Sequence, residues 1–135
     1  MLQLSKRVEY GLIALRHMAS GGDTQIFTTK EVAEKYHISY QLLAKIMQRL
    51  AKEKLISSYQ GVHGGYTLLR RPESVTVGSI INAIEGKSNV PIVQCEAETA
   101  ESCVIHDTCT IKDPLVKLQH NINKMFDQIT VSELL

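Results

Sequence analysis

The 135-residue sequence has no hydrophobic run approaching the roughly 18 residues that a membrane-spanning helix needs. Its first twenty residues also lack the uninterrupted apolar core of a secretion signal, because charged side chains are scattered through them at Lys6, Arg7, Glu9 and Arg16. These two absences predict a cytoplasmic protein that has no membrane partner.

The sequence also lacks the residue patterns typical of an enzyme. No nucleophile stands in a recognisable arrangement with a general base. The glycine-rich stretch Gly61–Gly65 lies between two β-prone segments and does not precede a helix, as a phosphate-binding loop would. We therefore expect a non-enzymatic protein.

Net charge is nearly absent as well, at +1 for the whole chain, but this value conceals two different halves. Residues 1–71 contain eleven Lys and Arg against five Asp and Glu, whereas residues 72–135 contain four against nine. A basic half beside an acidic half is typical of a polyanion-binding module with a separate control module. Chance clustering of solvated charges is the alternative.

Hydrophobic periodicity and turn residues predict a mainly helical fold with one hairpin. Four helices are expected, over residues 5–20, from Thr28 or Thr29 to Tyr36, from Ser39 to about Lys54, and from Ser74 or Thr76 to Gly86. The third helix should bury the apolar positions Leu43, Ile46, Met47 and Leu50. Two β-prone segments around the glycine-rich turn predict a hairpin. This order is that of a winged helix-turn-helix, mainly α with a small β-hairpin wing.

The last third of the chain divides into an irregular segment and a final helix. Residues 87–113 show no periodicity, and a loop of this length in a small domain usually carries function. Asp113 and Pro114 are a suitable cap and first-turn pair for the final helix. Its apolar stripe follows heptad spacing, at Leu115, Leu118, Ile122, Met125 and Ile129. This stripe predicts a long C-terminal dimerisation helix in a homodimer, and packing onto its own domain is the alternative. The expected parts are 1–86, 87–113 and 114–135.

In a winged helix-turn-helix the third helix enters the major groove of double-stranded DNA. Gln41, in its first turn, offers a donor and an acceptor that match adenine. Lys45 and Arg49 are suited to phosphates, as is Lys30 at the start of the second helix. Gln60 and His63 flank the wing tip and could enter a minor groove. The predicted DNA-binding residues are Lys30, Ser39, Tyr40, Gln41, Lys45, Arg49, Gln60 and His63. The alternatives are solvated surface residues and glycines that only form a tight turn.

Five stretches of the sequence resemble the bacterial regulator family that includes IscR, NsrR, RsrR and CymR. They are Leu4–Leu12, Ile38–Leu50, Gly61–Leu68, Val75–Ile80 and Phe126–Leu135. The resemblance covers essentially the whole chain and implies a homodimeric winged-helix protein that binds a palindromic operator. One position departs from the pattern, because several members have Arg where this chain has Gln60. A neutral side chain is attracted less strongly by the minor groove, so the affinity or site preference at that position is expected to differ from that of those members.

Three cysteines stand at the spacing Cys95-x7-Cys103-x5-Cys109. An odd number argues against a closed disulfide framework, and the spacing lacks the C-x2-C pairs of common zinc modules. Thiolates are the usual ligands of iron–sulfur clusters. The spacing resembles the loop of the IscR and NsrR branch, which implies a 2Fe–2S or 4Fe–4S cluster. A thiol or zinc switch is the alternative.

Such a cluster usually takes four protein ligands, so the three cysteines leave one to be found. The IscR branch has a histidine where this chain has Lys112, which cannot serve while protonated. In the NsrR and RsrR branches an acidic residue on the partner's first helix takes part, and that position is Glu9 here. A further histidine of RsrR has no counterpart, since Ile13 occupies its place. His106 is the alternative ligand, and a vacant or small-molecule-ligated site is the third possibility.

The resemblance therefore predicts a cluster-dependent transcriptional repressor that senses redox state, nitric oxide or iron–sulfur supply. Two alternatives remain open from the residues. One is a DNA-binding regulator switched by thiols or zinc. The other is a winged-helix module that docks on a metabolic enzyme.

Overall fold

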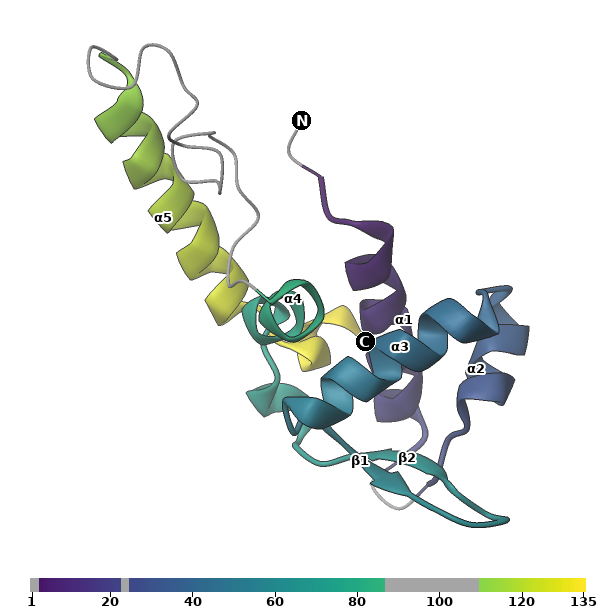
Figure 1. Cartoon of the computed structure of the whole chain (residues 1–135). Helices are drawn as coiled ribbons and strands as arrows, with labels where there is room; N and C mark the ends of the chain where they lie inside the picture. The colour runs from purple at the N-terminus through teal and green to yellow at the C-terminus, as the bar shows by residue number, and fades with distance from the viewer. Residues whose placement is uncertain (1–2, 23–24, 87–109) are drawn as a thin grey trace.

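The computed structural model describes residues 3–22, 25–86 and 110–135, which form five α-helices and one hairpin (Figure 1). The predicted ligands Cys95, Cys103, His106 and Cys109 lie outside the described residues. The elements are α1 (Lys6–Ser20), α2 (Thr29–Tyr36), α3 (Tyr40–Lys52), β1 (Ile56–Tyr59), β2 (Gly65–Leu68), η1 (Pro72–Ser74), α4 (Val77–Glu85), α5 (Lys112–Gln128) and η4 (Val131–Leu134). None of the described helices is long and apolar enough to cross a membrane. The predicted mainly helical fold with a small hairpin is confirmed.

Short polar side chains start the first four helices. Ser5, Thr28, Ser39 and Thr76 each accept a hydrogen bond from the backbone N–H three residues later. These bonds satisfy donors that have no partner inside the helix, and each such cap contributes about 1 kcal/mol. The structure thus selects Thr28 over Thr29 and Thr76 over Ser74.

The start of α5 differs from the prediction of an Asp113 cap. The helix begins at Lys112, and the residue at the cap position, Ile111, makes no side-chain hydrogen bond there. Pro114 lies inside the first turn, where its missing N–H costs nothing because that group has no helical partner. Asp113 also lies in the first turn, where a negative charge faces the positive end of the helix dipole.

The core lies between α1, α2, α3 and α4, and the hairpin packs at its edge (Figure 1). The four predicted apolar positions of α3 are all buried, with at most 1 % of their surface exposed. They belong to one buried cluster with Leu15 and Met18 of α1 and the isoleucines of α4. The buried side of α3 therefore fixes which of its side chains point to solvent.

α5 begins away from this core and runs back toward it, and the C-terminal segment that follows packs on the core (Figure 1). The N–H of Val77 donates to Ile129 O (2.9 Å) and the N–H of Val131 donates to Val75 O (2.9 Å). Val131 is buried, and Arg16 Nε donates to Leu134 O (2.9 Å). The predicted terminal turn, present as η4, thus anchors the end of α5 to the winged-helix body.

The hairpin is extended by a bridge that the sequence did not predict. Phe27 and Tyr66 exchange two backbone hydrogen bonds, of 2.8 and 2.7 Å, so the residues before α2 join the start of β2, next to the turn. A Cβ placed on Gly65 would lie 2.5 Å from Phe27 O, and one on Gly64 would lie 2.5 Å from Tyr59 O. Both glycines are thus required by contacts within the chain itself.

Replacing Gly65 with alanine should separate Phe27 from Tyr66, because the added methyl group meets backbone that has little room to move. We expect a loss of about 1–3 kcal/mol in the free energy of unfolding, measured by urea denaturation. Ser58→Ala, at an exposed position of the same hairpin, should stay within about 0.5 kcal/mol of the wild type. Equal stability of the two variants would contradict the proposed backbone contact.

Candidate nucleic-acid interface

A cleft of about 570 Å³ lies between the start of α2, the exposed side of α3 and the hairpin. Three residues of α3 line it at steps of four, Tyr40, Ala44 and Gln48, so they occupy one face of the helix. Other lining residues are Thr28, Thr29, Lys30, Ser58, Tyr59, Gln60, Gly61, Gly64, Gly65 and Tyr66. The cleft is therefore walled by a helix on one side and a wing on the other.

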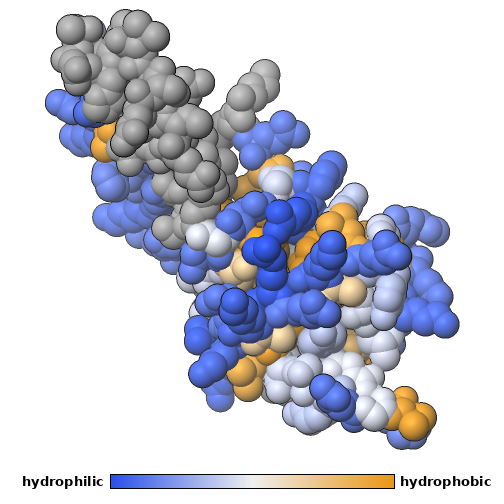
Figure 2. Space-filling model, viewed as in Figure 1, coloured by the Kyte–Doolittle hydropathy of each residue, from blue (hydrophilic) through white to orange (hydrophobic). Residues whose placement is uncertain are grey.

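Three predicted DNA-binding residues meet in this cleft, namely Lys30, Tyr40 and Gln60. Gln41 is exposed beside Tyr40 in the first turn of α3, and His63 is exposed near the end of the hairpin. Figure 2 shows hydrophilic side chains over α3 and a hydrophobic projection at the end of the hairpin. Val62, between Gly61 and His63, is 98 % exposed.

Gln48 was missed by the sequence reasoning. It lies two turns after Tyr40 on the same face of α3, and the small Ala44 between them leaves the face open. A step-of-four pattern starting from Tyr40 would have found it. An amide here adds a second hydrogen-bonding group along the wall of the cleft.

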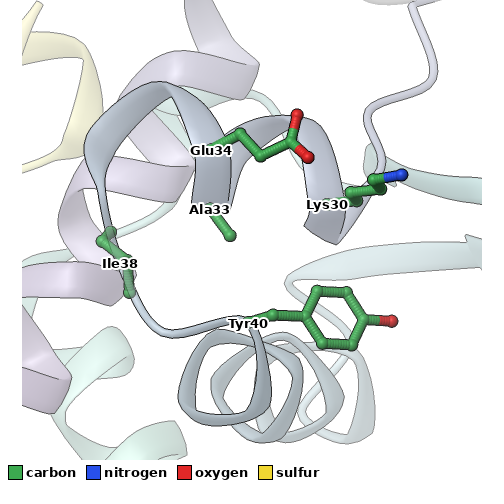
Figure 3. A pocket seen from close by; sticks show the side chains of 5 residues that line it. All are labelled: Lys30, Ala33, Glu34, Ile38 and Tyr40. Carbon is green, nitrogen blue, oxygen red and sulfur yellow. The ribbon is translucent and has the colours of Figure 1, made fainter.

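Ser39 has a structural part in this surface, since its hydroxyl accepts from Leu42 N (3.4 Å) and starts α3. Beside it, a hollow of about 440 Å³ lies between α2 and α3, lined by Lys30, Ala33, Glu34, Ile38 and Tyr40 (Figure 3). The Tyr40 ring extends from α3 toward the end of the hollow at which Lys30 of α2 lies (Figure 3). Tyr40 is 57 % exposed and thus available to a ligand.

Lys45 and Arg49 do not join the cleft. They line a second hollow, of about 320 Å³, together with Arg7, Leu42 and Ile46. Each follows a cleft residue by one position, and one step along a helix turns the side chain by about 100°. The Arg49 guanidinium is also engaged, because its Nη1 donates to Ile84 O (2.9 Å).

The position of α2 is supported by an aromatic contact with α1. Tyr36 Oη lies 3.0 Å from His17 Nδ1, and the His17 ring packs edge-on against both Tyr36 and Phe27. Burial, followed by the nearby charge of Lys35, lowers the pKa of His17 below its usual value. The neutral ring therefore belongs to the packing between α1 and α2.

Glu9, the predicted carboxylate ligand, lies on α1 with its side chain 40 % exposed. Lys6 Nζ donates to its Oε2 (2.8 Å), and this hydrogen bond, with the charge of the carboxylate, raises the pKa of Lys6. A surface ion pair of this kind contributes little to the stability of the fold. Within the described ranges, no three His, Cys, Asp or Glu residues gather into a group that could hold a metal. The Glu9 side chain is thus partly exposed and paired with Lys6.

Comparisons with known proteins agree with this architecture. Residues 4–135 match the family model Rrf2, described as an iron-dependent transcriptional regulator. NsrR of Shouchella clausii is 29 % identical over 133 residues, covering 98 % of this chain and 88 % of that protein. NsrR of Halalkalibacterium halodurans is 28 % identical, covering 99 % and 90 %.

Two solved structures have the same arrangement. IscR of T. potens is 27 % identical, with a TM-score of 0.75 over 98 % of this chain and 85 % of its own. CymR of B. subtilis, the global cysteine regulator, has a TM-score of 0.77 at 24 % identity over 99 % and 96 %, which shows the fold alone. The winged-helix architecture is thus confirmed, and the relatives are transcriptional regulators, which are not enzymes. The chain belongs to the Rrf2 family of transcriptional regulators.

Proposed function

We propose that this regulator is a repressor whose affinity for a palindromic operator depends on an iron–sulfur cluster. The observation that carries the DNA-binding part is the cleft formed by α3, the start of α2 and the hairpin. Tyr40 and Gln41 would meet base edges in the major groove, and Gln48 would follow deeper along the same helix. Lys30 and the N–H groups at the start of α2 would hold a phosphate, while Gln60 and His63 approach the minor groove.

The second part of the proposal is a homodimer joined through α5. Leu118 and Met125, one heptad apart, are each 47 % exposed, and Ile111 is 55 % exposed. Large apolar side chains at heptad spacing are typical of a helix that pairs with another helix. Two copies joined in this way would place two α3 helices for the two half-sites of a palindrome.

The third part is the cluster, held by Cys95, Cys103 and Cys109 with Glu9 of the partner subunit. Support comes from the thiol spacing, from the exposed Glu9 carboxylate and from the similarity to NsrR and IscR relatives. When bound, such a cluster would supply iron that reacts with nitric oxide or oxygen and that can be oxidised or reduced. A carboxylate is a poorer ligand for this iron than a thiolate, so Glu9 is the ligand expected to leave first. His106 is the alternative fourth ligand.

The test of the DNA-binding part is selection by the full chain from a random duplex library. We expect a palindromic sequence to be enriched and its affinity to fall steeply with salt, as phosphate contacts require. No enrichment, or binding that ignores salt, would favour a module that docks on another protein.

A thiol-switched regulator is the second candidate function, and the fold shared with CymR is the observation that favours it. Protein purified without oxygen distinguishes the two. The cluster predicts a brown protein with stoichiometric iron and sulfide, whereas a thiol switch predicts colourless protein whose DNA affinity changes with oxidant.

Replacing Glu9 with alanine should speed the loss of the cluster under oxidant, because one of four ligands is removed. We expect a rate increase of about tenfold or more, followed by absorption at the charge-transfer bands. Lys6→Ala is the matched control, since it removes the ion pair and leaves the carboxylate. Cluster stability and oxidant response that stay unchanged in Glu9→Ala would exclude Glu9 as the ligand.

Replacing Gln60 with arginine should tighten DNA binding by roughly tenfold, because a cation is drawn to the negative potential of a narrow minor groove. The gain should be larger on A·T-rich flanks, and the salt dependence should steepen. Fluorescence anisotropy with matched A·T-rich and G·C-rich duplexes measures both effects. Gln60→Met, of similar length and without charge, is the control. An arginine variant that binds like the methionine variant would place Gln60 away from DNA.

A further inference from the structure

The carbonyl oxygen of Ile84 accepts hydrogen bonds from two arginines that come from different helices. Arg7 Nη2 of α1 lies 2.8 Å away and Arg49 Nη1 of α3 lies 2.9 Å away. Ile84 stands in the last turn of α4, where carbonyl groups have no helical partner and the dipole favours cations. One atom thus joins three helices.

The surrounding packing leaves these helices little freedom. A Cβ on Gly11 of α1 would lie 2.4 Å from Ile84 Cδ1 and 3.6 Å from Ile46 Cγ2, so α1 contacts both α4 and α3 at this point. Ile84 and Ile46 are buried. Figure 1 shows α3 and α4 side by side next to α1.

The end of α4 is held to α1 by further polar contacts. Ser5 Oγ donates to Glu85 Oε1, and Glu85 Oε2 lies 3.8 Å from Arg7 Nη1. On the α3 side, Arg49 is the side chain with a hydrogen bond to α4 among the described residues. Arg49 therefore connects the DNA-reading helix to a joint that α1 and α4 already form.

We infer that Arg49 is a positioning residue that fixes α3 through the Ile84 carbonyl, and that it is not a phosphate-binding residue. This inference rests on the proposed DNA-binding function and deepens it. Ile84 is the penultimate residue of α4, so the hydrogen bond from Arg49 links the end of α4 to the recognition helix. Gly86 caps α4, and residues 87–109 follow it in the chain. Arg7 supports this position from α1.

Salt dependence separates positioning from phosphate binding. Removing a phosphate contact lowers the slope of log affinity against log salt by about 1, on specific and random DNA alike. Disturbing the position of α3 leaves that slope unchanged and reduces the preference for the specific sequence. A loss of about tenfold in preference equals one lost base contact.

The experiment uses the full chain with two duplexes, one selected by the wild type from a random library and one of random sequence. We expect Arg49→Lys and Arg49→Gln to keep the wild-type salt slope and to lose about tenfold of the preference. Lysine should not rescue, because its ammonium ends closer to the backbone than the Arg49 Nη1 that donates to Ile84 O. Lys45, one turn earlier on the same side of α3, is exposed and keeps its predicted phosphate-binding role, so Lys45→Gln should lower the slope by about 1 and keep the preference.

An Arg49→Gln slope lower by about 1, restored by lysine, would overturn the inference and make Arg49 a phosphate contact. Arg7→Gln is the second variant, and an unchanged preference in it together with unchanged preference in Arg49→Lys would also overturn the inference. Amide hydrogen exchange adds a readout without DNA, since α3 should exchange faster in Arg49→Lys than in Lys45→Gln. A wild type without sequence preference would instead refute the proposed function.

Discussion

Replacing Leu118 and Met125 with glutamate should convert the protein into a monomer and weaken binding to a palindromic duplex by about a hundredfold or more. Both side chains lie on one stripe of α5 and are nearly half exposed. In a dimer, glutamates at these positions would bury like charges against each other. A monomer contacts one half-site at a time, so the gain from binding the second half-site within the same complex is lost.

Sedimentation measures the oligomeric state, and fluorescence anisotropy on the selected duplex measures the affinity. The matched control is Lys117→Glu with Lys124→Glu, which places the same substituents one position earlier on the exposed face of α5. This control should remain dimeric. A wild type that sediments as a monomer, or a Leu118/Met125 variant that remains dimeric, would contradict the proposed interface.

Replacing Cys103 with serine should abolish cluster retention, so that the anaerobically purified variant contains almost no iron or sulfide. Serine has nearly the shape of cysteine but offers a hydroxyl in place of the thiolate that iron–sulfur clusters require. Iron and sulfide analysis, together with visible absorption, gives the result directly.

Ser102→Ala is the matched control for this substitution, since it changes the adjacent residue and leaves all three thiols. It should stay brown. Full iron content in the Cys103 variant would remove that cysteine from the ligand set. Iron-free wild type would favour the thiol-switched regulator.

The amphipathic parts of the fold could be predicted from the sequence because their information is local. The buried face of α3, the Ser39 cap and the glycine-rich hairpin each depend on residues within a few positions of one another. For two helices the sequence left two possible cap residues. The structure distinguishes them, because the hydroxyl groups of Thr28 and Thr76 each accept a hydrogen bond from the backbone N–H three residues later.

The contacts that the sequence could not predict join residues far apart in the chain. Arg49 has the charge and the exposure of a phosphate-binding residue. Its hydrogen bond to Ile84 O depends on how α3 packs against α4. The Phe27–Tyr66 bridge likewise depends on where α2 begins relative to the hairpin. Which face of α3 lines the cleft depends on the position of the hairpin relative to α3. The sequence does not give that position, and Gln48 was missed for this reason.

The proposed role of Glu9 as a cluster ligand depends on a second chain. Its position on α1 and its exposed carboxylate are properties of one chain. Whether it meets the cysteines of a partner depends on the dimer through α5. The Glu9 and Leu118/Met125 variants are therefore coupled, and a monomeric variant should lose its cluster at least as fast as Glu9→Ala.

Control of DNA affinity by the cluster can be measured within one preparation of the protein. A single anaerobic preparation of known iron and sulfide content is divided, and a chelator removes the cluster from one portion. The dissociation constant of each portion for the selected duplex is then measured at the same salt concentration. The proposal predicts values that differ by about tenfold or more, whereas equal affinities, or a preparation that never contained iron and sulfide, would contradict it.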